Sequence, residues 1–318
     1  MKKISAFLLT IVILFVSGCS AAQNADTNTS NADSSDDAMS LKSAVCADTF
    51  DFNDNYVQIG ITSEYDYYYF SNHNQSFFNE FIDFLTSTQT KPTNNYDHGT
   101  NELYITFCDS SFTYQSLNIN EKDQVCIYDG TAETKYSSEG VYNKLIECLT
   151  PHLKSYEKYC RAATTPILHM YEYAVYDKDG QILESDSVSK QPYLFWDGSN
   201  TVHLWGQSGT GQLTRWARFF DVESGKASPA FYRQTDYFGE LVCTAESGQV
   251  GLYDMFSGKL LYCFDKFDKP TADYTENIIS AYFSNDGKEL IVCYYSSDGT
   301  KEKQIFDVFS IKDDEQNK

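Results

Sequence analysis

Apolar and polar residues follow four different patterns along the 318-residue chain. Residues 4–16 are mostly apolar, whereas residues 20–40 contain no aromatic and no β-branched aliphatic side chain. Between residues 49 and 162, stretches with the alternation of strands are mixed with stretches that have the spacing of helices. From residue 163 onward helical spacing disappears. The pattern therefore predicts four segments, with boundaries after residues 18, 48 and 162.

The third segment, 49–162, is predicted to form a small α+β domain. Apolar side chains at helical spacing indicate a helix over residues 76–89, with Asn74 or Ser76 as its N-cap. A second helix over 139–149 is expected to be interrupted or restarted at Pro151. Alternating stretches rich in aromatic residues indicate strands at 59–70, 102–107, 111–119 and 124–129. Helices packed on one antiparallel sheet are the expected arrangement.

The fourth segment, 163–318, predicts an all-β domain of repeated hairpins. Similar phrases, each a strand that ends in aspartate and continues into a tight turn, occur at Asp177, Asp221, Asp254 and Asp307. Asp-Gly dipeptides within residues 285–287 and 297–299 are typical of short hairpin turns. The intervals between the phrases are irregular, so the repeat predicts similar units of unequal length.

Two short motifs in this segment resemble those of the WD-repeat and related β-propeller families. They are Tyr253-Asp254 and the FSNDGK stretch at residues 283–288. The resemblance implies blades, each an antiparallel sheet of about 40 to 45 residues. The segment has room for three or four blades, whereas propellers close with about four to eight. We therefore expect an α+β domain followed by blade-like antiparallel hairpins, arranged as an incomplete propeller or as a β-sandwich.

The N-terminus resembles the export signal of bacterial lipoproteins. Two lysines precede the apolar run, which is shorter than the about 20 residues that span a bilayer. The next residues match the lipobox: Val16-Ser17-Gly18-Cys19. The resemblance implies a signal peptide at residues 1–18, a lipid on Cys19 and attachment to the extracytoplasmic face of the cell membrane. Residues 19–48 are then expected to form a disordered tether, with a reach of about 25 Å for its first 21 residues.

The charge balance excludes two classes of partner. The chain has 24 Lys and Arg against 45 Asp and Glu, a formal net charge of −21. Nucleic acids and anionic membrane surfaces are bound by clustered cations, so neither is an expected partner of the protein surface. The expected contact with the membrane is through the N-terminal lipid.

Patterns that would indicate catalysis or metal binding are incomplete. The glycine-rich stretch 206–212 lacks the Lys and Ser or Thr of a phosphate-binding loop, and it fits a hairpin loop better. Residues 177–180 place glycine two positions too early for a calcium loop, which favours a plain turn. The five histidines have no metal-binding or catalytic spacing. We expect no cofactor, no metal site and no catalytic residue.

Eight cysteines follow Cys19, five before residue 163 and three after it. They cannot all pair within their own half of the chain. Most are expected to be small apolar residues of strands. If a disulfide forms, Cys108 with Cys126 is the preferred pair.

A cluster of tyrosines is the candidate binding surface: Tyr65, Tyr67 and Tyr69. Tyrosine combines a flat apolar ring with a hydroxyl, which suits glycan and protein partners. The alternative is a sheet that is covered on both faces. The expected function is a lipid-anchored extracytoplasmic binding protein, not an enzyme, with an envelope protein or glycan as partner. The alternatives are an envelope-polymer hydrolase and an extracytoplasmic regulator of a membrane sensor.

Overall fold

The computed structural model describes residues 38–46, 50, 52, 57–63, 65–97, 101–108, 114–165, 170–207, 215–246, 248–265, 267, 277–284 and 286–308. The lipobox with Cys19 lies outside the described residues.

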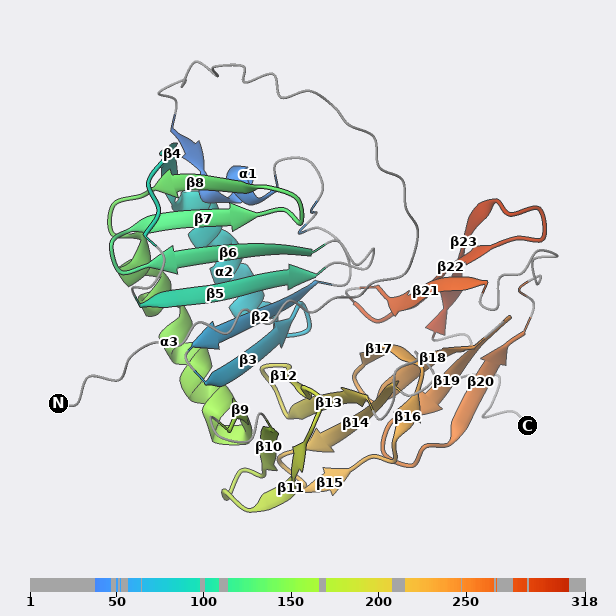
Figure 1. The fold of residues 1–318 in the computed structure, drawn as a ribbon. Coiled ribbons are helices and arrows are strands. Elements are labelled where there is room, and N and C mark those ends of the chain that lie inside the picture. Colours follow the sequence, from blue (N-terminus) through green and yellow to red (C-terminus); the bar gives the residue numbers. More distant parts are fainter. Residues whose placement is uncertain are drawn as a thin grey trace.

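The N-terminal part is an antiparallel sheet with helices on one face (Figure 1). Its strands are β1 (Met39–Ser40), β2 (Gln58–Ser63), β3 (Asp66–Ser71), β4 (Gln89–Pro92), β5 (Glu102–Cys108), β6 (Tyr114–Asn120), β7 (Gln124–Tyr128) and β8 (Glu133–Ser137). They lie in the order β1-β4-β8-β7-β6-β5-β2-β3. The helices are α1 (Leu41–Val45), α2 (Gln75–Ser87) and α3 (Val141–Tyr159). Their apolar side chains share one core with the strands.

Helix α2 confirms the helix predicted from apolar spacing. It begins after Asn74, whose side-chain oxygen accepts a hydrogen bond of 3.1 Å from the backbone N–H of Phe77. This bond satisfies one of the free N–H groups at the start of the helix. The apolar stripe that includes Phe81 and Leu85 is buried against the sheet.

Helix α3 does not end at Pro151, so the predicted interruption is wrong. Proline inside a helix removes one hydrogen bond and costs about 3 kcal/mol. Leu149 and His152 are nevertheless both buried, and the buried face continues as far as Tyr156. Packing of this face against the sheet offsets the local cost. No helix in the described part of the chain is long and apolar enough to cross a membrane.

The predicted tether of residues 19–48 includes residues that belong to the folded part. Strand β1 pairs with β4, and Leu41 and Val45 of α1 are 0% and 1% exposed. The side chain of Ser40 caps α1 by accepting a hydrogen bond from the N–H of Ser43. Two buried side chains in this short helix are enough to hold it on the core, so the fold begins before residue 40.

The C-terminal part is all-β and consists of blade-like antiparallel sheets. Its strands are β9 (Cys160–Thr164), β10 (Tyr171–Tyr176), β11 (Ile182–Val188), β12 (Tyr193–Trp196), β13 (Thr201–Gln207), β14 (Arg215–Asp221), β15 (Lys226–Ala227), β16 (Phe231–Tyr232), β17 (Gln234–Phe238), β18 (Leu241–Glu246), β19 (Gln249–Asp254), β20 (Leu260–Phe264), β21 (Ile278–Phe283), β22 (Glu289–Tyr295) and β23 (Lys301–Asp307). β17–β20 form a four-stranded sheet and β21–β23 a three-stranded one. The fold is therefore the predicted one, an α+β part followed by an incomplete propeller-like fan.

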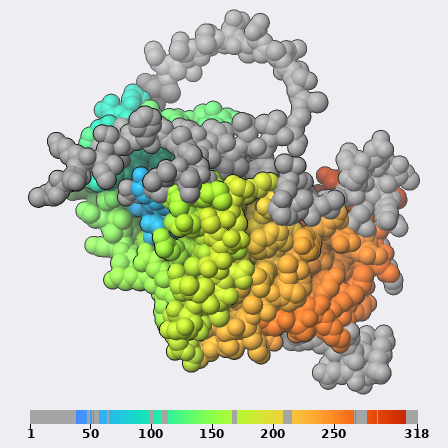
Figure 2. Space-filling model, turned by 60° about the horizontal axis from the view of Figure 1, so that its bottom comes forward, coloured from blue at the N-terminus to red at the C-terminus, as the bar shows by residue number. Residues whose placement is uncertain are grey.

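The two parts share a sheet. β3 pairs with β12 in parallel, with Tyr69 opposite Phe195, and it also meets β9, where Asp66 lies opposite Ala163. The predicted boundary after residue 162 thus falls inside β9. Figure 2 shows the same continuity on the surface, where the green α+β part passes directly into the yellow and orange blades.

Three of the four repeated aspartates close the turns that follow their strands: Asp177, Asp221 and Asp254. The segment that follows Asp307 lies outside the described residues after Val308. Asp177 accepts hydrogen bonds of 2.9 and 2.7 Å from the N–H groups of Asp179 and Gln181. Asp254 accepts one of 2.8 Å from the N–H of Ser257. These carboxylates satisfy backbone donors, which confirms the prediction of strands that run into tight turns. In the described part of the chain, no group of three or more His, Cys, Asp or Glu could hold a metal ion.

The preferred disulfide is excluded by the strand order. Cys108 lies in β5 and Cys126 in β7, and β6 runs between these two strands. Two strand spacings separate the cysteines by at least about 9.5 Å, beyond the roughly 7 Å between Cα atoms that a disulfide bridges. Cys126 is instead a buried strand residue, as expected for most of the cysteines.

Candidate functional site

The face of the sheet opposite the helices has a distinct chemistry. Alternation along β2, β5, β6 and β7 places apolar residues on the helix side, and these form the core. On the other side, Thr62 pairs with both Tyr67 and Tyr104, and Tyr104 pairs with Asn118. The next row brings together small and aromatic residues: Tyr69, Gly60, Thr106, Ser116 and Tyr128. Tyrosines therefore alternate with small polar residues across several strands.

We call this surface the tyrosine face and define it by five residues: Tyr67, Tyr69, Tyr104, Tyr114 and Tyr128. They come from β3, β5, β6 and β7. Tyr104, Tyr114 and Tyr128 are 43%, 49% and 38% exposed, so large parts of three rings meet solvent. The sheet is covered by helices on one face and presents aromatic rings on the other.

The three tyrosines predicted as a binding surface occupy different positions. Tyr67 is half-buried, and its ring is parallel to that of Tyr69 at 6.5 Å. Tyr65 is 43% exposed and lies in the turn between β2 and β3. The prediction of one continuous strand over 59–70 is therefore wrong, because this stretch folds into a hairpin of two paired strands. Tyr69 is only 8% exposed, because its ring packs against Tyr193 and Phe195. The prediction of an exposed Tyr69 is therefore wrong: its ring lies beside that of Tyr67 but is covered by the β12 side chains.

Gly60 explains why Tyr69 lies flat on the sheet. A Cβ atom at position 60 would lie 2.7 Å from Oγ1 of Thr106 and 3.3 Å from the ring of Tyr69. Glycine leaves that space to the aromatic ring of the neighbouring strand. A larger residue at position 60 would displace Thr106 or the ring of Tyr69.

Two tyrosine hydroxyl groups, one on the face and one beside it, have raised pKa values. Burial, followed by the nearby carboxylate of Glu102, raises the pKa of Tyr104 to about 12. Burial also raises the pKa of Tyr193, whose ring packs at an angle against Tyr69, to about 12. The hydroxyls of Tyr104 and Tyr193 are therefore protonated at neutral pH, and each can both donate and accept a hydrogen bond.

The tyrosine face extends toward the blades. Tyr193 of β12 lies next to Tyr69, with ring centres 5.0 Å apart, and it contacts Trp205 of β13 edge to face at the same distance. The guanidinium of Arg215 lies 5.2 Å from the Trp205 ring. Aromatic rings thus continue from the α+β part onto the first strands of the fan.

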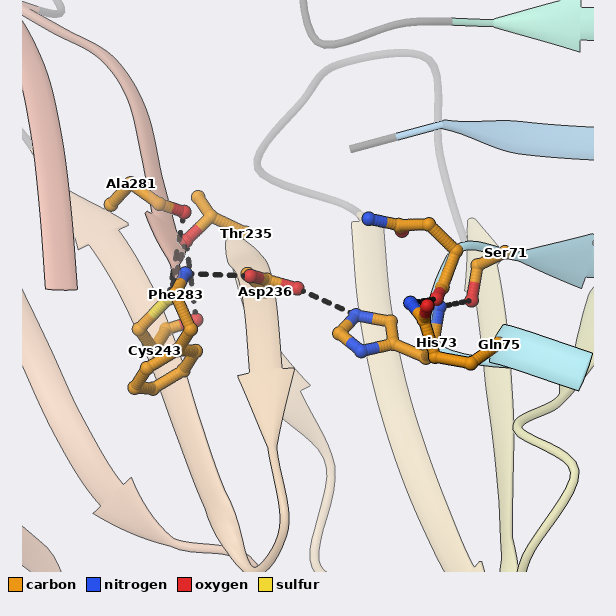
Figure 3. Close-up of polar contacts among 9 residues, drawn as sticks. Ser71, His73, Gln75, Thr235, Asp236, Cys243, Ala281 and Phe283 are labelled. Atoms are coloured by element: carbon orange, nitrogen blue, oxygen red, sulfur yellow. Dashed lines mark hydrogen bonds and ion pairs between the residues drawn. The ribbon is translucent and has the colours of Figure 1, made fainter. Parts of the chain in front are cut away.

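A polar contact joins the α+β part to the four-stranded sheet where the two parts meet (Figure 3). His73 lies in the turn between β3 and α2, and its Nε2 is 3.0 Å from Oδ1 of Asp236 in β17. The other oxygen of Asp236 accepts a hydrogen bond of 2.8 Å from the N–H of Phe283 in β21. Asp236 is 2% exposed and connects three separate elements.

A small cavity lies beside this contact, lined by residues that include His73, Asp236 and His203. Its volume is ≈10 Å³, close to that of a single water, and this leaves no space for an organic substrate. His203 stacks on Phe219 with ring centres 4.7 Å apart. Burial, with a smaller contribution from His73, lowers the pKa of His203 to about 3, so its imidazole is neutral. This region positions the blades, and the tyrosine face is the better candidate for binding.

Sequence reasoning missed most of the face. Tyr104 and Tyr128 lie in strands that were predicted, in phase with the outward positions of those strands. That alternation was the available signal, but the strand order was needed to place these residues beside Tyr67. His73 and Asp236 are 163 residues apart, and no motif connects them.

Comparisons with known proteins give only distant structural similarity. No family model and no curated protein matches the chain. The β-propeller domain of the trilobed protease from Pyrococcus furiosus is 12% identical, with a TM-score of 0.30 and 69% coverage of each chain. Dihydro-heme d1 dehydrogenase NirN is 10% identical, with a TM-score of 0.31 and coverage of 79% of this chain and 53% of that chain. Kluyveromyces lactis Hsv2 is 12% identical, with a TM-score of 0.29 and coverage of 78% and 70%. Similarity at this level transfers no function to the chain.

Proposed function

We propose that this chain is a lipid-anchored, non-catalytic binding protein on the extracytoplasmic face of a bacterial membrane, and that the tyrosine face binds an envelope glycan. The anchor rests on the lipobox at Val16–Cys19. The binding role rests on one observation, a sheet face on which three tyrosines are each more than a third exposed.

The shape of the tyrosine face favours a polymer over a small molecule. Sites for small ligands are concave and enclose most of the ligand surface. The tyrosine face follows a sheet, and its rings lie on three adjacent strands, β5, β6 and β7. An extended ligand can contact several of these rings at once, whereas a single small molecule would remain largely exposed.

The chemistry of the face favours a glycan over a protein. The rows mix rings with small, partly exposed polar side chains: Thr62, Thr106 and Ser116. Protein interfaces have a more apolar centre, in which charged residues are depleted. A sugar ring offers an apolar face to each tyrosine and hydroxyl groups to the polar residues between them. Because the chain carries a net charge of −21, a neutral glycan is favoured over an anionic one.

The test is cosedimentation of the full chain with purified, protein-free cell-wall polysaccharide. Replacing both Tyr104 and Tyr114 with serine removes two exposed rings, and at about 0.5–1.5 kcal/mol per aromatic contact we expect the apparent affinity to fall roughly tenfold or more. Tyr295→Ser is the matched control, because Tyr295 is 37% exposed but lies in β22 of another sheet.

Two results would contradict the proposal. One is that the wild-type chain does not sediment with the polysaccharide, and the other is that the double variant and the control bind equally. Capture of an envelope protein by the wild-type chain but not by the double variant would assign the tyrosine face to a protein partner instead.

A further inference from the structure

Strand β20 is an unprotected edge of the fan. It is the last strand of the four-stranded sheet, and among the described strands it pairs only with β19 (Figure 1). An edge strand presents a row of backbone N–H and C=O groups that another strand can pair with. Proteins commonly block such edges with charged side chains or proline.

The composition of β20 differs from that of two other outer strands, β23 and β11. Its sequence is LLYCF, without any charge or proline, and Leu260, Tyr262 and Cys263 are exposed. By contrast, β23, the outer strand of the neighbouring sheet, begins with Lys-Glu-Lys. β11 carries Glu and Asp along its length. β20 is thus an edge whose side chains favour strand pairing.

The residues that flank β20 indicate which strand fits this edge. Lys259 precedes the strand and Asp265 follows it. When two copies pair antiparallel about Tyr262, Lys259 of each copy lies opposite Asp265 of the other. Each end of the paired strands then holds one lysine facing one aspartate. In-register parallel pairing would instead place lysine opposite lysine and aspartate opposite aspartate, which is unfavourable. The edge is therefore complementary to itself in the antiparallel orientation.

We infer that two copies of this chain associate through antiparallel pairing of their β20 strands, which joins two four-stranded sheets into one of eight strands. The contact is isologous, with a twofold axis at Tyr262. A neutral, apolar edge limits the electrostatic repulsion between two chains of net charge −21. This inference is independent of the tyrosine face, because β20 lies in a different sheet.

Charge reversal tests both the contact between the two β20 strands and their antiparallel orientation. The full chain in mild detergent is examined by sedimentation velocity over a range of concentrations. Lys259→Asp alone and Asp265→Lys alone each place like charges at both ends, and we expect each to weaken dimerisation several-fold. The double variant exchanges the two charges and restores the opposite pairs, so its dimerisation should return to near the wild-type level.

Cys263 provides a second readout. In the proposed register Cys263 lies diagonal to its copy, at about 7–8 Å, which is within reach of a short bismaleimide. We expect the reagent to give a covalent dimer of the wild-type chain. Cys263→Ser should remain dimeric by sedimentation without forming the crosslink. Tyr262→Lys should lose both the sedimenting dimer and the crosslink, while its thermal unfolding stays cooperative.

The inference is overturned if the wild-type chain is monomeric at every concentration. It is also overturned if the double charge variant is as weak as the single variants, because the partner of the edge would then not be a second β20.

Discussion

His203 shows how a single buried residue links stability to pH. Its ring stacks on Phe219, faces the edge of Tyr237 at 5.2 Å and is 5% exposed. Burial keeps the imidazole neutral, because a charged ring would lose its hydration without gaining a partner.

We predict that His203→Phe makes unfolding less sensitive to acid. The unfolded histidine takes up a proton near its ordinary pKa of about 6.5, whereas the folded one has a pKa of about 3. Stability is therefore lost as the pH falls below about 6.5, and between pH 7 and pH 5 the wild type should lose about 2 kcal/mol relative to the variant. Urea unfolding of both proteins at pH 7, 6 and 5 measures this difference. An equal pH dependence of the two proteins would contradict the prediction.

At the residue scale, the sequence predicted that tyrosines form the candidate binding surface, but it did not predict which tyrosines lie together. The sequence pointed to Tyr67 and Tyr69 because they stand close together in one strand. Tyr104 and Tyr128 join them only through the pairing order of five strands, β3-β2-β5-β6-β7, and no local pattern encodes that order. Tyr69 is buried by rings from β12, more than 120 residues away in the chain.

Among the elements, α1 attaches the first described residues of the chain to the core. Leu41 is fully buried, and its N–H donates a hydrogen bond of 2.7 Å to the C=O of Thr88 at the end of α2. We predict that Leu41→Ala lowers the free energy of unfolding by about 2–4 kcal/mol, because it leaves a cavity in the core.

The matched control for α1 is deletion of residues 21–37, which should leave the free energy of unfolding unchanged within about 0.5 kcal/mol. Urea unfolding of the three chains compares them directly. Equal stability of Leu41→Ala and the wild type would show that α1 does not belong to the core.

Local patterns predicted the longest elements of the α+β part and failed where tertiary packing dominated. The helix at α2 and the strands β5, β6 and β7 follow from spacing and alternation, whereas α1 and the short strands β1, β4 and β8 were not predicted. Pro151 was expected to break α3, but the buried residues on either side of it keep the helix continuous. The parallel contact between β3 and β12 has no sequence signal, because it joins two segments by a single register pair, Tyr69 with Phe195.

For the whole molecule, the proposed attachment depends on Cys19. We predict that Cys19→Ser moves the protein from the membrane fraction to the soluble fraction, because the acyl chains supply about 0.8 kcal/mol per buried CH₂. Fractionation of cells followed by immunoblotting measures this change. Binding of the released protein to cell-wall polysaccharide should be unaltered. A variant that remains in the membrane fraction would show that another segment holds it there.

The position of β1 places the N-terminal tether at one end of the long sheet. β1 lies at one end of a strand order that continues through β3 and β12 to β15. Eight strand spacings separate β1 from β12, the first strand of the fan in this order, so at about 4.8 Å each the path along the sheet is about 38 Å, longer than the expected reach of the tether, about 25 Å. In the proposed attachment at Cys19, the distance that the fan can reach from the lipid therefore depends more on the sheet than on the tether. Removing the tether would shorten this reach by less than half.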